Sequence, residues 1–174
     1  MTGNRARFEQ IVLPHVDAAY NLARWLTRND HDAEDVLQDA MLRAYRFFDG
    51  LRGAPRPWLL AIVRNACFSW LRANRPAELA AIDDDIQEAD VAGPEALAAR
   101  ELDRRMLNEA IAALPVQFRE ALVLRELEDL SYKEIARIAG VPIGTVMSRL
   151  ARARRLLAES MKPAAAAPRL RLHK

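Results

Sequence analysis

Apolar residues recur every three or four positions along the first 75 residues, the spacing that places them on one face of an α-helix. The recurrence divides into three runs, from Phe8 to Leu26, from Val36 to Phe48 and from about Trp58 to Asn74. Pro14 interrupts the first run and should kink or split it, since proline lacks the N–H that an inner helical turn requires. The pattern predicts a bundle of three or four helices.

The second half of the chain resumes this helical spacing after a gap. Helices are predicted from near Glu95 through Leu114 and again over Phe118–Glu128, with Pro115 as the boundary between them. The intervening segment has weak periodicity and many acidic residues, a composition typical of a linker. We expect an all-α fold of two small helical domains, 5–75 and 95–162, joined by a flexible acidic linker, 76–94, and followed by a tail, 163–174.

The most informative segment covers residues 130–146. Ser131, followed three positions later by Glu134, forms a capping box, which marks the start of a helix. Gly140 suits the left-handed residue that ends a helix, and Pro142 suits the first turn of the next one. Two helices joined by so short a turn form a helix-turn-helix, whose second helix enters the major groove in DNA-binding proteins.

A rotation of about 100° per residue divides the second helix of this motif into two faces. Its apolar face, expected in the core, holds Val146, Leu150, Ala153 and Leu157. Its opposite face, expected to contact DNA, holds Thr145, Ser148, Arg149 and Arg152. Hydroxyl and guanidinium groups bind phosphates and base edges. A basic amphipathic helix is more often merely solvated, but the capped helix and tight turn that precede this one favour DNA binding.

The charge of the chain is unevenly distributed, although its net value is only +2. Between Glu78 and Asp103 there are nine acidic residues and a single base, Arg100. From Arg149 to the end the bases dominate and Glu159 is the only acid. A basic end beside an acidic middle indicates a nucleic-acid surface next to a solvated connection.

The composition argues against metal, redox and catalytic chemistry. Cys67 is the only cysteine, so the chain has neither an intramolecular disulfide nor a thiolate cluster, and its three histidines lie too far apart to share a metal. Asp35 and Asp39 lie one helical turn apart, but no nucleophile or metal-binding cluster accompanies them, and a solvated or partner-binding face is the better interpretation. We therefore expect no catalytic residue, cofactor or metal. Without a signal peptide or a membrane-spanning run, we expect a cytoplasmic protein.

Two parts of the chain resemble the extracytoplasmic-function (ECF) sigma factors of the sigma-70 family. Leu124–Ala136 and Gly144–Arg154 are similar to the region 4 signature of that family. Ala33–Arg46 is similar to its region 2.2, and Pro57–Asn65 to its regions 2.3 and 2.4. The two signatures occur in the family's order, with a suitable linker between them, and the resemblance covers most of residues 5–160. It implies an alternative sigma factor that directs core RNA polymerase to promoters.

The resemblance also implies roles for individual residues, carried over by position. Binding to the clamp of the polymerase β′ subunit falls to Asp35, Gln38, Asp39 and Leu42. Capture of the −10 element falls to Arg56, Trp58, Arg64 and Asn65. Recognition of the −35 element falls to Lys133, Thr145, Met147, Ser148, Arg149 and Arg152. Further implied partners are the polymerase β flap and an anti-sigma factor. Met147 and Ala151 depart from the larger polar, basic or aromatic residues common in relatives, which leaves the −35 preference open.

Two other readings of the sequence remain. A stand-alone helix-turn-helix regulator would need no polymerase, but it leaves the polar face around Gln38 unexplained. A sigma-like decoy for an anti-sigma factor usually carries a receiver domain, for which the chain has no room. Among the aromatic residues near arginines, Tyr45, Phe48 and Trp70 are expected in the core, whereas Phe47 and Phe68 fit either the core or stacking on unpaired bases.

Overall fold

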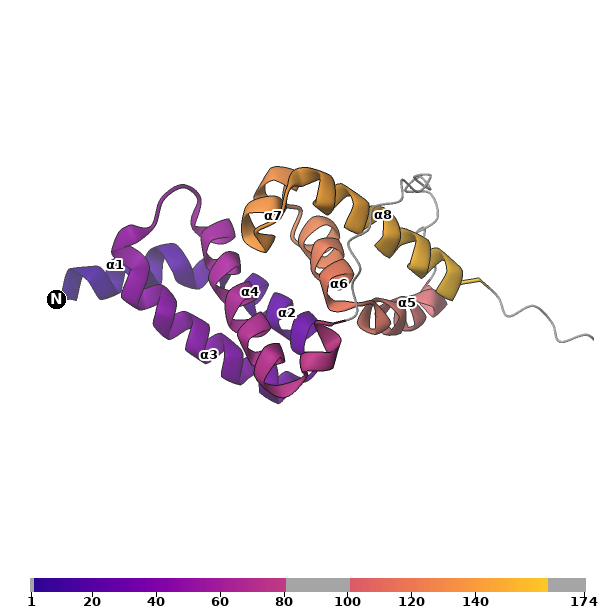
Figure 1. Cartoon of the computed structure of the whole chain (residues 1–174). Helices are drawn as coiled ribbons and strands as arrows, with labels where there is room; N and C mark the ends of the chain where they lie inside the picture. The colour runs from indigo at the N-terminus through magenta and orange to yellow at the C-terminus, as the bar shows by residue number, and fades with distance from the viewer. Residues whose placement is uncertain (1, 81–100, 163–174) are drawn as a thin grey trace, which may run out of the picture.

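The computed structural model describes residues 2–80 and 101–162, here called the N-terminal unit and the C-terminal unit. Every regular element within them is a helix, as the apolar spacing predicted. The acidic linker falls mostly outside the described residues, and so does the tail. Figure 1 shows the helices of the two units as two groups that lie side by side.

The N-terminal unit is a bundle of four α-helices: α1 (Thr2–Val12), α2 (Val16–Thr27), α3 (Asp30–Phe47) and α4 (Pro55–Asn74). A 3₁₀ turn at Leu13–His15 separates α1 from α2, which confirms the break expected at Pro14. The helices α2, α3 and α4 pack on one another and enclose fully buried residues such as Leu22, Leu26 and Leu59.

Local signals account for where α3 and α4 begin. The Asn29 side chain accepts a hydrogen bond from the backbone N–H of Asp32 at 3.0 Å and so caps α3. The helix α4 begins at Pro55, three residues before the expected start at Trp58. Proline has the backbone angle of a first helical turn, and the N–H that it lacks would have no partner there. The two prolines of this segment therefore start the helix rather than a loop.

The C-terminal unit contains α5 (Glu101–Ala113), α6 (Val116–Leu122), a π-helical turn (Val123–Leu127), α7 (Tyr132–Ala139) and α8 (Ile143–Ser160). The helix predicted over Phe118–Glu128 therefore starts two residues earlier and ends in a widened turn. Its expected apolar face is buried as predicted, through Phe118, Ala121, Leu122 and Leu124.

The helix-turn-helix is formed by α7 and α8. The capping box is complete, because Ser131 Oγ accepts from the N–H of Glu134 at 3.1 Å and a Glu134 carboxylate oxygen accepts from the N–H of Ser131 at 2.9 Å. Gly140 ends α7 with φ of 67°, in the left-handed region. Pro142 is the residue just before α8 rather than part of its first turn.

The two units also pack against each other, which the sequence did not predict. The helix α4 contacts α7, and α2 contacts α6 (Figure 1). Arg119 of α6 is almost fully buried and donates to the backbone oxygens of Ala112 at 2.9 Å, of Leu114 at 2.8 Å and of Leu26 in α2 at 3.4 Å. Burial lowers the pKa of Arg119 to about 10, so its guanidinium remains charged at neutral pH.

Candidate nucleic-acid and polymerase interfaces

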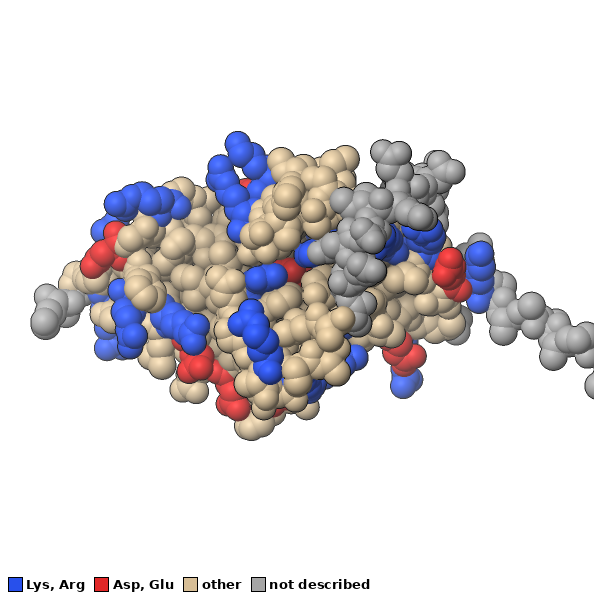
Figure 2. All heavy atoms as spheres, viewed as in Figure 1, with Lys and Arg blue, Asp and Glu red and all other residues tan. Residues whose placement is uncertain are grey.

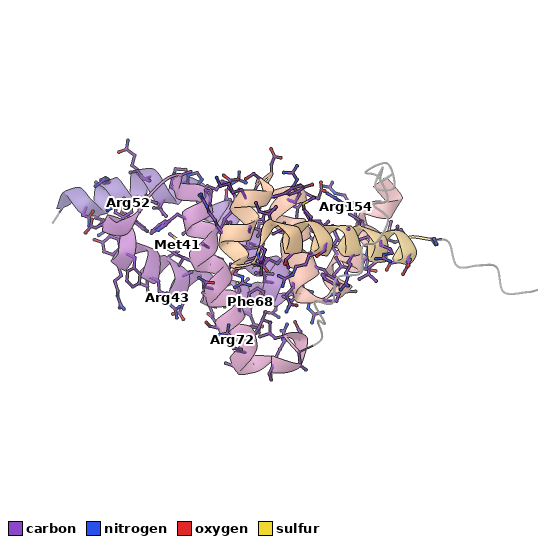
Figure 3. The ribbon with its side chains drawn as sticks, turned by 45° about the horizontal axis from the view of Figure 1, so that its top comes forward. Met41, Arg43, Arg52, Phe68, Arg72 and Arg154 are labelled. Atoms are coloured by element: carbon purple, nitrogen blue, oxygen red, sulfur yellow. The ribbon has the colours of Figure 1, made fainter. Side chains whose placement is uncertain are left out.

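One face of α3 is open to solvent and carries all four residues predicted to bind polymerase. Asp35 lies three to four positions before Gln38 and Asp39, which lie three to four positions before Leu42, and all four are exposed. Leu42 is the most exposed of the large apolar residues in the described chain, at 65%. Figure 3 shows the neighbouring Arg43 projecting from α3 on the side away from the C-terminal unit. This face thus combines a protruding apolar group with two carboxylates on the helical turns before it.

The four residues predicted to capture the −10 element do not form an open face. Asn65 is exposed, whereas Trp58 is half-buried against the core of the N-terminal unit. Arg56 and Arg64 point to the C-terminal unit. Arg64 Nε donates to Glu120 Oε1 at 2.6 Å, and Arg56 Nη2 donates to Glu128 Oε2 at 2.5 Å. Both arginines are therefore held by carboxylates of the other unit.

Arg64 is further enclosed by Phe68, one turn along α4. Its guanidinium carbon lies 3.7 Å from the centroid of the Phe68 ring, a cation–π contact. Phe68 itself is buried, so it belongs to the core rather than to a surface on which bases stack. Figure 3 shows Phe68 on α4, near the helices of the C-terminal unit.

Glu120 and Glu128, which form these contacts, were not singled out from the sequence. Their side chains are only 1% and 5% exposed. Glu120 lies on α6 among Phe118, Ala121 and Leu122, all buried. The sequence could have pointed to Glu120, because a carboxylate in a helix that is apolar on most sides is expected to be buried and then needs a partner. The sequence does not say which arginine supplies it.

The surroundings of Glu120 act on its pKa in opposite directions. Burial raises the pKa of Glu120, and the nearby cations of Arg64 and Arg149 lower it. The Glu120 Oε2 atom has no hydrogen-bond donor within the described parts of the chain. The carboxylate is thus only partly compensated for its loss of water.

The DNA face expected on α8 is present in part. Lys133 of α7 and Met147 of α8 are exposed, Met147 at 52%, whereas Thr145, Ser148 and Arg152 are half-buried. Ser148 Oγ donates to the backbone oxygen of Thr145 at 3.0 Å. Ile143, in the first turn of α8, adds an exposed apolar side chain that the sequence analysis did not include.

Arg149 was predicted on that exposed face, but it is only 7% exposed in this structure, and its contact with DNA stays a prediction. It lies about 60° around α8 from Val146, at the edge of the apolar side. From there its side chain turns inward beside Glu120, Gln117 and Ile135, which line the same small gap. A long side chain at the edge of a helix face can reach a buried partner, and rotation alone does not show this.

The aromatic residues near the arginines differ in how far they are buried. Phe48 is buried and Trp70 packs against the core, as expected, but Tyr45 is partly exposed, at 43%. Tyr45 stacks edge-on against Phe8 at the end of α3, with 5.2 Å between the ring centroids. Phe47 is exposed beside it. The outer end of α3 therefore presents aromatic surface.

Basic side chains lie over both units on the face shown in Figure 2, with fewer acidic ones among them. Within the described ranges, no group of histidine, cysteine and carboxylate side chains is arranged to hold a metal ion. None of the described helices combines the length and the apolar character needed to cross a bilayer. Cys67 is buried in α4, and burial raises the pKa of its thiol to about 12.

Comparison with known proteins assigns each unit to a known region. Residues 11–76 match Sigma-70 region 2, and residues 104–157 match Sigma-70 region 4. The ECF RNA polymerase sigma factor SigM of Mycobacterium tuberculosis is 37% identical over 160 residues, covering 91% of this chain and 79% of SigM. SigE of Mycolicibacterium smegmatis is 34% identical over 162 residues, covering 90% of this chain but only 63% of that longer relative.

A solved structure extends the similarity to the fold. The sigma factor RpoE of Bartonella quintana, in complex with the anti-sigma factor NepR, superposes with a TM-score of 0.70 at 30% identity. The match covers 91% of this chain and 99% of the RpoE chain. Two region matches in the family's order and relatives aligned over nine tenths of the sequence lead to one conclusion: the chain belongs to the ECF sigma factors of the sigma-70 family.

Proposed function

We propose that the two units divide the work of promoter recognition, the N-terminal unit binding polymerase and the −10 element and the C-terminal unit reading the −35 element. The observation that carries this proposal is the pairing, in one chain, of an open acidic and apolar face on α3 with a fully capped helix-turn-helix. A sigma factor needs both, because it must attach to core RNA polymerase and to DNA at once.

The α3 face has the make-up of a protein-binding surface. Leu42 is an apolar anchor, and Asp35, Gln38 and Asp39 form a polar rim around it. Interfaces commonly bury such an apolar centre inside a polar edge, with most of the binding energy at the centre. We assign this face to the clamp of the β′ subunit. The C-terminal unit would bind the β flap.

The first turns of α8 have the make-up of a major-groove reader. Met147 and Ile143 can contact the methyl group of thymine, and Arg152 and Lys133 supply cations for bases or phosphates. The N-terminal residues of a recognition helix contact the base edges in this motif. The apolar pair Ile143 and Met147 therefore predicts that this chain prefers a −35 sequence that differs from those of its relatives.

The remaining parts of the proposal concern energy, regulation and location. Promoter melting would draw on binding energy, without catalysis or nucleotide hydrolysis. An anti-sigma factor is a proposed partner, supported by the Bartonella quintana relative solved with NepR. The chain would act in the cytoplasm, where RNA polymerase works.

The test is transcription by purified core polymerase on a library of randomised promoters. We expect the chain to select promoters with two conserved elements and the core enzyme alone to select none. A stand-alone regulator would bind DNA without holding the core enzyme, and a decoy would hold an anti-sigma factor without opening promoters. Either result would overturn the proposal.

A further inference from the structure

The recognition helix α8 is held on α6 by a row of apolar contacts. The buried residues of this row are Val146, Leu150, Ala153 and Leu157. Apolar attraction has no preferred direction, so such a row opposes a small rotation of α8 about its own axis only weakly. A rotation of about 20° would move a side-chain tip at a radius of about 5–6 Å by about 2 Å, enough to break a hydrogen bond to a base. Reading a sequence therefore needs a further contact that fixes the rotation.

A pair of opposite charges lies at the edge of this row. Arg149 of α8 and Glu120 of α6 are both almost fully buried, and they line one gap together with Gln117 and Ile135. The gap has no room for a water molecule. Burial raises the pKa of Glu120, and the cations of Arg64 and Arg149 lower it. The guanidinium of α8 therefore helps to compensate a carboxylate of α6 where water cannot.

A buried pair of this kind favours one arrangement of the helices more than it adds stability. Desolvation offsets much of the attraction between the two charges, but separating them inside the core leaves each without compensation. Glu120 Oε2 already lacks a hydrogen-bond donor within the described ranges, so moving the Arg149 cation away would leave it still less compensated. The pair thus opposes the rotation of α8 that the apolar row permits.

We infer that Arg149 is a positioning residue for −35 recognition: through Glu120 it fixes the rotation of α8 and so directs the exposed side of this helix at the base edges, without reading a base itself. This inference rests on the proposed role of α8 in reading the −35 element. The burial of Arg149 supports it, because the guanidinium would have to leave the core before it could reach DNA. Met147, on the same helix, is exposed and has no such obstacle.

The test uses the holoenzyme, formed from the full chain and core RNA polymerase. It binds promoters with a fixed −10 element and a randomised −35 element, and sequencing of the bound fraction gives the discrimination at each base pair. The salt dependence of binding is measured on the selected promoter. The variants are Arg149→Met, Glu120→Gln, the two combined, and Arg149→Lys, which keeps a cation near the carboxylate.

We expect Arg149→Met and Glu120→Gln each to lower discrimination by about fivefold or more at every base pair that α8 reads, because its side chains shift together and a good base contact supplies at least that much. The salt dependence should not change, since no phosphate contact is lost. The combined variant should lose little more than either alone, because both changes remove one contact. Arg149→Lys should retain most of the discrimination.

Two controls remove charges that do not fix α8 in this way. Arg154→Met removes another arginine of α8, whose partner Glu126, at 2.8 Å, is half exposed. Glu128→Gln weakens the contact with the N-terminal unit, as Glu120→Gln also does, but leaves the carboxylate beside Arg149 in place. Neither control should change the −35 discrimination. Unfolding curves check that each variant is folded, and Glu120→Gln, which keeps the shape of the side chain, serves where Arg149→Met is not.

Loss of discrimination at a single base pair in Arg149→Met, with full discrimination in folded Glu120→Gln, would overturn the inference and make Arg149 a base reader. Additive losses in the combined variant, or a weaker salt dependence in Arg149→Met, would overturn it too. A wild-type holoenzyme that selects the −10 element but shows no −35 preference would overturn the proposed role of α8 itself, a failure seen before any variant is tested.

Discussion

The helices α3 and α4 belong to one bundle and both carry residues predicted to bind a partner, yet the structure treats them in opposite ways. On α3 all four predicted residues are exposed, with Leu42 at the end of the row. On α4 the two predicted arginines are engaged by carboxylates of the C-terminal unit. One face is ready for its partner and the other is covered.

This difference implies an order of binding. A chain in this conformation can offer α3 to polymerase before it can offer α4 to DNA. Under the roles proposed for α3 and α4, the arginines assigned to DNA would become available only after the units part.

The largest effect is expected at Cys67, on the buried side of α4. Cys67 is fully buried, and burial raises the pKa of its thiol to about 12, so both the lack of access and the scarcity of thiolate should slow its alkylation by orders of magnitude in the folded chain. The alkylation rate of native and urea-unfolded chain, followed by mass spectrometry at pH 8, measures it.

A change at Leu42 on the α3 face should strongly weaken polymerase binding. Leu42→Asp places a charge in the proposed apolar anchor, and we expect a loss of about 2–4 kcal/mol of binding free energy to core polymerase, as for a central interface residue. Fluorescence anisotropy of labelled chain measures it. Met106→Asp is the control, since Met106 is similarly exposed but lies on α5 of the other unit. Equal losses of binding from both variants would show that the α3 face does not bind polymerase.

Substitutions at Arg149 and Arg152 should have different effects, because Arg149 is buried beside the Glu120 carboxylate and Arg152 is not. Arg149→Ala should lower the free energy of unfolding of the C-terminal unit by about 3 kcal/mol, as expected when one member of a buried charge cluster is removed. Arg152→Ala should lower it less and should instead weaken binding to the selected −35 duplex by about 1–3 kcal/mol. Urea unfolding and duplex binding measure the two. The reverse ranking in unfolding would mean that Arg149 does not stabilise the cluster.

The smallest effect is expected at the start of the helix-turn-helix. Ser131→Ala removes the hydroxyl that caps α7 and should cost about 1 kcal/mol of unfolding free energy. Ser160→Ala is a suitable control, because Ser160 lies exposed at the end of α8 and caps no helix start. Its effect should stay within about 0.5 kcal/mol. If Ser131→Ala lowers the free energy of unfolding no more than Ser160→Ala does, the capping box does not stabilise α7.

Sequence reasoning reached what is local and missed what joins distant parts of the chain. Helix spacing, the break at Pro14 and the Ser131–Glu134 box depend on residues within one or two turns, so they could be predicted. The pairs Arg64–Glu120 and Arg56–Glu128 span 56 and 72 positions, and no periodicity links such residues. The inward turn of Arg149 was missed for the same reason, since the nearby Glu120 carboxylate lies on another helix.

Energy transfer between dyes attached at Asp49→Cys and Glu159→Cys, recorded as core polymerase is added, tests the ordered-binding account most directly. We predict high transfer in the free chain, a fall on addition of core enzyme, and no fall when the chain also carries Leu42→Asp. Transfer that stays high while the chain is bound to polymerase and opens promoters would contradict the account.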